Sequence, residues 1–314
     1  IKDVIDGGSD SVHPAFIVNG VEVPEIYISK FQNVIHNGRA YSLPGEDPRT
    51  SVTFDTARQA CEAKGRGWHL MTHAEWAAIA LWCRKNNLMP KGNNNYGKDH
   101  SETTYIAIPN PNHQDEGRTS RVLTGTGPVT WSHNGEVTGI WDLNGNVWEW
   151  CGGYRTLGGE IHILPNNNAA DPNNSQSASS ELWRAILENG SLVDPNTDGT
   201  LKWDFVDGKI TLCKTITNQA DASRSTEFKN LAVAPEVSTV PEILKALALF
   251  PADNGDHGGD YFYMNNGAGL ERLASRGGHW IRGAGAGVFC LGGGDSRSAS
   301  TPYIGFRSAF IPGI

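Results

Sequence analysis

The C-terminal stretch from Arg276 to Arg307 constrains the fold of this chain more than any other segment. Apolar residues such as Trp280 and Phe306 recur in it among glycines, whose backbones permit tight bends. The residues between these apolar positions follow neither the period of a helix nor that of a strand. We therefore expect short strands joined by irregular segments, in which packing does not select the intervening residues.

The composition limits the classes of protein to which the chain can belong. Its 314 residues suffice for one large domain or two ordinary ones, and 38% hydrophobic residues supply a core. The net charge of -8 argues against nonspecific binding to nucleic acid, because phosphate neutralisation needs a basic surface. The apolar runs are far shorter than the roughly 20 residues of a membrane span. We expect neither nucleic-acid binding nor membrane insertion.

The cysteines and the N-terminus say little about the cellular compartment. No signal peptide is visible at Ile1, so the localisation cannot be read from the start of the chain. No CxxC pair occurs, which predicts reduced and mostly buried thiols, with one or two disulfides as the alternative. The cysteines in question are Cys61, Cys83, Cys151, Cys213 and Cys290.

Capping signals predict two helices in the first third of the chain. Thr72 and Glu75 form a capping box, in which each side chain satisfies a free amide of the other residue. A helix is therefore expected from His73 to Lys85. Thr53 or Asp55 is expected to cap a shorter helix before it.

Turn dipeptides and a change in composition indicate the organisation of the remaining sequence. Asn-Gly at 19–20 and Asp-Gly at 207–208 each lie between β-rich runs and predict hairpins. Short helices are expected at 181–188 and 241–250. The polar tracts of residues 155–270 give this block the character of an insertion.

Four segments, in order, resemble the formylglycine-generating-enzyme domain. GNVWEW and the pair RGG and GFR are fairly specific in this order. The segments are PEIYISKFQN (24–33), WHLMTHAEW (68–76), GIWDLNGNVWEW (139–150), and RGGHW with GFRSA (276–280 and 305–309).

The resemblance implies an α+β, loop-rich variant of the C-type lectin fold. It covers about 11–154 and 271–310. We therefore expect an N-terminal tail at 1–10 and a single C-type-lectin-like domain at 11–314. A large insertion would lie at about 155–270.

Two enzymatic interpretations fit the residues poorly. The oxidase chemistry of the family needs two neighbouring cysteines, and the C-terminal stretch contains only Cys290. His69, His73 and Glu75 have the HxxxHxE spacing that sulfoxide synthases use for iron. With Thr72 capping the helix, these side chains point in different directions, so surface or capping histidines are favoured. We expect no enzyme and no required cofactor.

The pattern RGG-x-W, GVF-x-L and x-IGFR resembles the variable proteins of diversity-generating retroelements. These ligand-binding proteins of phages, bacteria and archaea carry a hypervariable region, here at about 276–307. The mutagenesis acts on adenines, mostly in AAC codons, which never become Lys, Glu, Gln, Met or Trp. None of these five occurs from Ile281 to Arg307. Chance absence from so short a glycine-rich segment is the alternative.

This resemblance implies two classes of residue in the variable region. The scaffold would be held by Trp280, Val288, Phe289, Leu291, Arg297, Ile304, Phe306 and Arg307. The ligand would be faced by His279, Ile281, Arg282, Ala284, Cys290, Gly292, Gly294, Asp295, Ala299, Thr301, Pro302 and Tyr303.

The function expected from this resemblance is non-catalytic, receptor-type ligand binding. The partner would be a protein or glycan on a cell surface, and the protein would lie on a phage tail tip or on a cell. An oligomer is possible. The alternative is an undiversified lectin-like or structural module, and an oxidase ranks last.

Calcium is a possible structural cofactor. The formylglycine-generating type holds calcium beside the GNxWEW motif; Asp142 and Glu149 would supply carboxylates and two further residues main-chain oxygens. Alternatively, Asp142 and Asn144 shape the turn and Glu149 pairs with a scaffold arginine. The run 194–199 resembles half of a calcium loop, but Phe205 replaces the bidentate glutamate, so a plain turn is favoured. The implied ligands are Asp142, Gly145, Val147 and Glu149.

Overall fold

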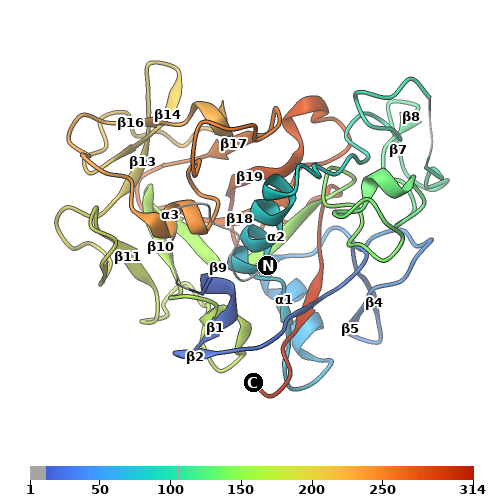
Figure 1. The fold of residues 1–314 in the computed structure, drawn as a ribbon, viewed down its shortest axis with the longest axis horizontal. Coiled ribbons are helices and arrows are strands. Elements are labelled where there is room, and N and C mark those ends of the chain that lie inside the picture. Colours follow the sequence, from blue (N-terminus) through green and yellow to red (C-terminus); the bar gives the residue numbers. More distant parts are fainter. Residues whose placement is uncertain (1–11, 105–106) are drawn as a thin grey trace.

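The computed structural model describes residues 12–104 and 107–314, and the expected tail at 1–10 lies outside them. The fold is mixed, with many strands and few helices (Figure 1). The helices are α1 (Phe54–Glu62), α2 (His73–Lys85) and α3 (Glu242–Ala246), with 3-10 turns η1 (Pro14–Phe16), η2 (Val129–Trp131), η3 (Asn168–Ala170), η4 (Phe228–Asn230) and η5 (Gly283–Gly285).

A large sheet forms the centre of the described chain and contains twelve strands. Its main path runs β15 (Arg224–Glu227), β17 (Tyr261–Met264), β19 (Gly287–Asp295), β18 (Glu271–Gly277), β9 (Trp148–Leu157), β10 (Glu160–Ile163), β13 (Lys202–Val206), β14 (Lys209–Cys213) and β16 (Ala232–Val233). Off this path lie β11 (Arg184–Ile186), β12 (Leu192–Val193) and β20 (Ile304–Phe306), of which β20 pairs in parallel with β9.

The smaller sheets bring the two ends of the chain together. The last strand lies between two early ones, because β21 pairs with both β3 and β6. Their strands are β1 (Ile17–Val18) with β2 (Val21–Glu22), β3 (Tyr27–Ile28) with β21 (Ser308–Phe310) and β6 (Trp68–Leu70), β4 (Val34–His36) with β5 (Arg39–Tyr41), and β7 (Gln114–Asp115) with β8 (Arg118–Thr119).

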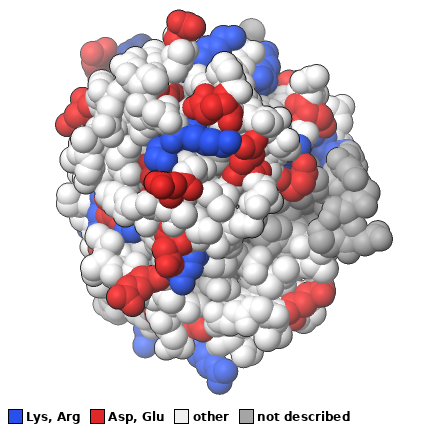
Figure 2. Space-filling model, turned by 90° about the vertical axis from the view of Figure 1, so that its left-hand side faces the viewer, with Lys and Arg blue, Asp and Glu red and all other residues white. Residues whose placement is uncertain are grey.

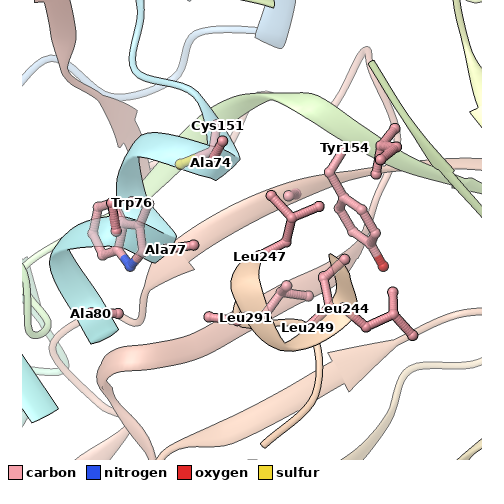
Figure 3. Packing of buried hydrophobic residues seen from close by; sticks show 14 of the residues in the cluster. Ala74, Trp76, Ala77, Ala80, Cys151, Tyr154, Leu244, Leu247, Leu249 and Leu291 are labelled. Carbon is pink, nitrogen blue, oxygen red and sulfur yellow. The ribbon is translucent and has the colours of Figure 1, made fainter. Parts of the chain in front are cut away.

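Helix α2 has the predicted bounds and packs on the middle of the sheet. Thr72 and Glu75 form the predicted capping box. Trp76 reaches β19, where its indole Nε1 donates a hydrogen bond to Val288 O over 2.7 Å. Figure 3 shows Trp76 and the alanines of α2 beside Leu291 and the leucines of the α3 segment. This core fixes β19, which runs through the predicted variable region.

The other local predictions hold in part. Thr53 caps α1, and hairpins form at 19–20 and 207–208 as predicted. The helix expected at 241–250 is shorter, because the chain bends at Ala248 with a φ of 47°. The helix expected at 181–188 is wrong. Strand β11 pairs with β10 there and places Trp183 in the core, so tertiary pairing overrides helical propensity.

Residues 155–270 are part of the central sheet. This block supplies strands on both sides of β9, β18 and β19, and it fills the left-hand side of Figure 1. The two ends of the sheet approach each other, since Ile210 N donates a hydrogen bond to Thr226 Oγ1 over 2.7 Å. The rings of Trp203 and Phe262 meet at 5.0 Å inside this curl. The block therefore shares its core with the rest of the domain.

The distribution of surface charge and the character of the helices bear on what the molecule can bind and on whether it can cross a membrane. On the face shown in Figure 2, basic and acidic side chains lie beside one another, and neither sign forms a continuous patch. Within the part of the chain that the structure describes, no helix has the length and apolar character required to cross a membrane.

Candidate functional site

The predicted scaffold residues of the variable region are buried or ion-paired. Trp280 is 3% exposed, and Ile304 and Phe306 are fully buried. Arg297 is partly exposed but pairs with Glu271 over 2.9 Å and with Asp55 over 3.1 Å. The remaining buried scaffold residues are Val288, Phe289, Leu291 and Arg307. These residues therefore occupy the positions that the sequence predicts for them.

Most of the predicted ligand-facing residues reach solvent. Ile281 is 45% exposed. Ala299 and Tyr303 pack partly against the core cluster that contains Ile304 and Phe306. The exposed or half-buried positions are Ile281, Arg282, Ala284, Gly294, Asp295, Ala299, Thr301, Pro302 and Tyr303.

His279, Cys290 and Gly292 are buried, which corrects their predicted exposure. Strand β19 is paired along both edges, with β17 and β18, and Cys290 packs in the core cluster that contains Ile304 and Phe306, where it is 0% exposed. A Cβ at Gly292 would lie 2.5 Å from Ser275 Oγ. Burial lowers the pKa of His279 to about 3, so its imidazole is neutral at ordinary pH. None of the three presents a side chain to solvent.

Aromatic rings support this part of the surface. His279 stacks on Tyr303 with ring centroids 4.8 Å apart, and it lies 6.3 Å from the ring of Trp148. Trp148 in turn meets Tyr263 edge-on at 5.9 Å. We call Trp148, Tyr263, His279 and Tyr303, together with Arg282, the aromatic face.

Arg282 lies over the rings of the aromatic face. Its guanidinium carbon is 4.8 Å from the Tyr263 centroid and 5.8 Å from that of Trp148. Among the described residues, its buried Nε has no hydrogen-bond partner and no carboxylate forms an ion pair with it. Burial also raises the pKa of the nearby Asp295 carboxyl. Arg282, Tyr263 and Tyr303 are half-buried and can meet an incoming group, whereas Trp148 and His279 are buried.

Tyr263 was not predicted to contribute to the candidate site. It lies on β17, which pairs in parallel with β19 and places Tyr263 beside Gly292. The residues Tyr261 to Met264 alternate between half-buried and buried positions. The aromatic run 261–263, which is typical of a strand, was the available signal in the sequence, but it could not identify the neighbouring strand.

The four residues of the implied calcium site do come together. The main-chain oxygens of Asp142, Gly145 and Val147 lie 3.2, 3.5 and 3.1 Å from Nε2 of Gln32. Glu149 Oε1 lies 3.0 Å from the same nitrogen. Gln32 could not be singled out from the sequence, although it belongs to the PEIYISKFQN segment.

Glu149 also pairs with an arginine, as the alternative interpretation predicted. Arg307 Nε donates to Glu149 Oε2 over 2.6 Å, and Arg307 Nη2 donates to Oε1 over 2.7 Å. Both side chains are buried. Burial raises the pKa of the neighbouring Asp142 to about 6. Of the two carboxylates expected to bind a cation, Glu149 is thus already paired, whereas Asp142 Oδ1 is buried without a hydrogen-bond partner among the described residues.

Residues 15–181 match the family model described as the sulfatase-modifying factor enzyme 1-like domain. The chain belongs to this family. The match covers just over half of the chain and includes the turn at 142–149, but it ends before the variable region at 276–307. Membership implies a C-type lectin-like fold. No curated protein matches the chain.

The thiols of this sulfatase-modifying factor-like chain are free. All five cysteines lie within the described residues, and they are unpaired and buried, so the alternative with disulfides is wrong. Burial raises the pKa of Cys290 well above that of an ordinary thiol. A thiolate, the form that binds copper and reacts, is therefore strongly disfavoured at this position.

Among the HxxxHxE residues of this family member, only His73 is separated from the other two, and both histidines are buried, which corrects the surface position favoured from the sequence. His69 Nε2 lies 2.8 Å from Glu75 Oε1. His73 Nε2 instead lies 2.9 Å from Leu247 O and 2.8 Å from Nη2 of Arg276. The segment therefore acts as a helix cap and as a link to α3.

The half-loop at 194–199 forms a turn that docks on another side chain. Asn196 has a φ of 66°, and its N–H donates to Glu160 Oε2 over 3.1 Å. Asp194 lies 3.4 Å from Arg184. This part of the structure agrees with the plain turn favoured from the sequence.

Proposed function

We propose that this chain is a non-catalytic ligand-binding protein of the type encoded by diversity-generating retroelements, with hypervariable residues on a C-type-lectin-type scaffold. The division of 276–307 into two sets of residues carries the proposal. The apolar anchors Ile304 and Phe306 are 0% exposed, whereas most intervening positions reach solvent and Ile281 is 45% exposed. Mutagenesis at such positions changes a surface and leaves the core intact.

The chemistry of the aromatic face supports a role in binding. Aromatic and arginine side chains contribute most of the energy at many interfaces. Tyr303 and Arg282 supply such groups, and the small residues Ala284 and Gly294 make the surroundings shallow. The ligand in this proposal is a protein or glycan on a cell surface. The protein itself would act on a phage tail tip or on a cell surface.

The thiol chemistry supports the absence of oxidase activity in this proposal. A thiol-based oxidase needs accessible thiolates that can bind a soft metal and exchange electrons. Cys290 is the only cysteine between 214 and 314, and its side chain is fully buried. The region that would carry the reaction therefore lacks a reactive pair.

Burial of three predicted variable residues favours a second candidate. His279, Cys290 and Gly292 are enclosed by packing, so random substitution at these positions would disturb the scaffold. An undiversified lectin-like module, with one fixed ligand on the aromatic face, requires no such variation.

The DNA beside the gene distinguishes these candidates. For a diversified protein, we expect a near-repeat of the segment encoding 276–307, with adenines at the mismatched positions, and a gene for a reverse transcriptase. Sequencing of the flanking DNA provides the measurement. A locus that contains neither element would contradict diversification and leave the undiversified module.

A further inference from the structure

The turn at 142–149 presents several oxygen atoms to one point. Main-chain oxygens of Asp142 and Val147 and the carboxylate of Glu149 all lie within 3.2 Å of Gln32 Nε2, and Gly145 O lies at 3.5 Å. Oxygen atoms that converge in this way are typical of a site for a hard cation. Here the point of convergence is occupied by an amide nitrogen of the chain itself.

The surrounding hydrogen bonds fix the orientation of this amide. Gln32 Oε1 accepts a hydrogen bond from Asn146 Nδ2 over 2.9 Å. Asn146 Nδ2 also donates to Val122 O, while its Oδ1 accepts from Val122 N and from Asn93 Nδ2. If the Gln32 amide were rotated by 180°, its NH₂ group would face the NH₂ group of Asn146. The NH₂ group of Gln32 must therefore face the converging oxygens.

The distances also suit an amide better than a metal ion. Calcium binds oxygen at about 2.3–2.6 Å. The oxygens surround Gln32 Nε2 at 3.0 to 3.5 Å, which are hydrogen-bond lengths. A cation could enter only if the Gln32 side chain left a position at which it is 0% exposed.

The Glu149 carboxylate of the turn already has a counter-charge. Arg307 neutralises Glu149 through two hydrogen bonds and also donates to Ser29 O and Trp141 O. Asp142 contacts Gln32 through its main-chain oxygen, while its carboxylate accepts from Gly125 N over 2.9 Å. The one carboxylate at the point of convergence, that of Glu149, is therefore already paired. Asp142 Oδ1 is buried without a hydrogen-bond partner among the described residues, but Asp142 reaches the point of convergence only through its main-chain oxygen.

We propose that the Gln32 amide and the Arg307 guanidinium together replace the calcium ion that this fold family implies at the turn. The turn leads directly into β9, which begins at Trp148, a ring of the aromatic face. Gln32 is thus a positioning residue that holds this ring without a metal. The inference does not depend on which ligand the aromatic face binds.

Calcium binding by the wild-type protein tests the proposal. In millimolar calcium chloride, we expect Tm to lie within about 1 °C of its value in EDTA, because a bound ion would raise it by several degrees. We also expect no saturable terbium luminescence that calcium displaces. A calcium-dependent rise in Tm, or displaceable binding of one terbium ion per chain, would overturn the proposal.

A matched pair of variants tests the role of Gln32 without calcium. Gln32→Glu replaces the donor NH₂ with an acceptor that faces oxygens, so we expect Tm to fall by roughly 5–10 °C in EDTA. Gln59→Glu makes the same chemical change at an exposed site of α1 and should shift Tm by about 1 °C or less. Equal melting temperatures for the two variants would count against Gln32 as the replacement. If Gln32→Glu does not fold, the wild-type calcium measurement still decides.

Discussion

Replacing Phe306 with alanine is expected to lower the free energy of unfolding by about 3–5 kcal/mol. Phe306 is 0% exposed, and it packs in the core cluster that contains Trp150 and Ile304. Its strand β20 pairs with β9, with Phe306 opposite Trp150, so the backbone around the cavity is held by the sheet and can collapse only in part. Chemical denaturation of the purified variant gives the value.

Two substitutions from the same region provide the matched comparison. Ala299→Ser and Thr301→Ser change half-buried residues that we assign to the ligand side. Each should alter the free energy of unfolding by no more than about 0.5 kcal/mol. If these two variants lose more stability than Phe306→Ala, the division between scaffold and surface is wrong.

Arg307→Ala is expected to destabilise the protein by about 3–5 kcal/mol, because it leaves the Glu149 carboxylate buried without a counter-charge. Arg307 is 0% exposed and forms two hydrogen bonds with Glu149. It also satisfies the main-chain oxygen of Trp141. The loss is measured by denaturant unfolding at neutral pH.

The control for this prediction is Arg39→Ala, at an exposed position of the hairpin β4–β5, which should cost less than about 0.5 kcal/mol. The double variant Arg307→Met with Glu149→Gln removes both charges and should recover part of the loss. A double variant less stable than Arg307→Ala would show that the ion pair does not explain the effect.

Local signals predicted the elements that depend on a few neighbouring residues. The Thr72 and Glu75 capping box marked the start of α2, and the Asn-Gly and Asp-Gly turns marked two hairpins. The helix predicted at 181–188 is wrong because the pairing of this segment with β10 and the burial of Trp183 depend on residues far away in the chain. Propensity contains no information about such partners.

The candidate site also contains features that could be predicted from the sequence and features that could not. The apolar anchors of 276–307 were predictable because most large apolar residues of a folded domain are buried. The burial of Cys290 and Gly292 was not, because a register shift between β18 and β19 and the parallel strand β17 decide which positions are covered. The role of Gln32 was also not predictable, because its amide contacts a turn that lies more than a hundred residues further along the chain.

Under the proposed function, folding does not select the residues between 276 and 307 that reach solvent. A scan of every single substitution over this region, with resistance to proteolysis as the readout, tests it most directly. We predict tolerance at the exposed positions, including Gly294, where an added Cβ meets nothing closer than 3.9 Å. The buried anchors and Gly293, where a Cβ would lie 3.0 Å from Tyr263 O, should tolerate few substitutions. Equal tolerance across both sets, or greater tolerance at the anchors, would contradict the account.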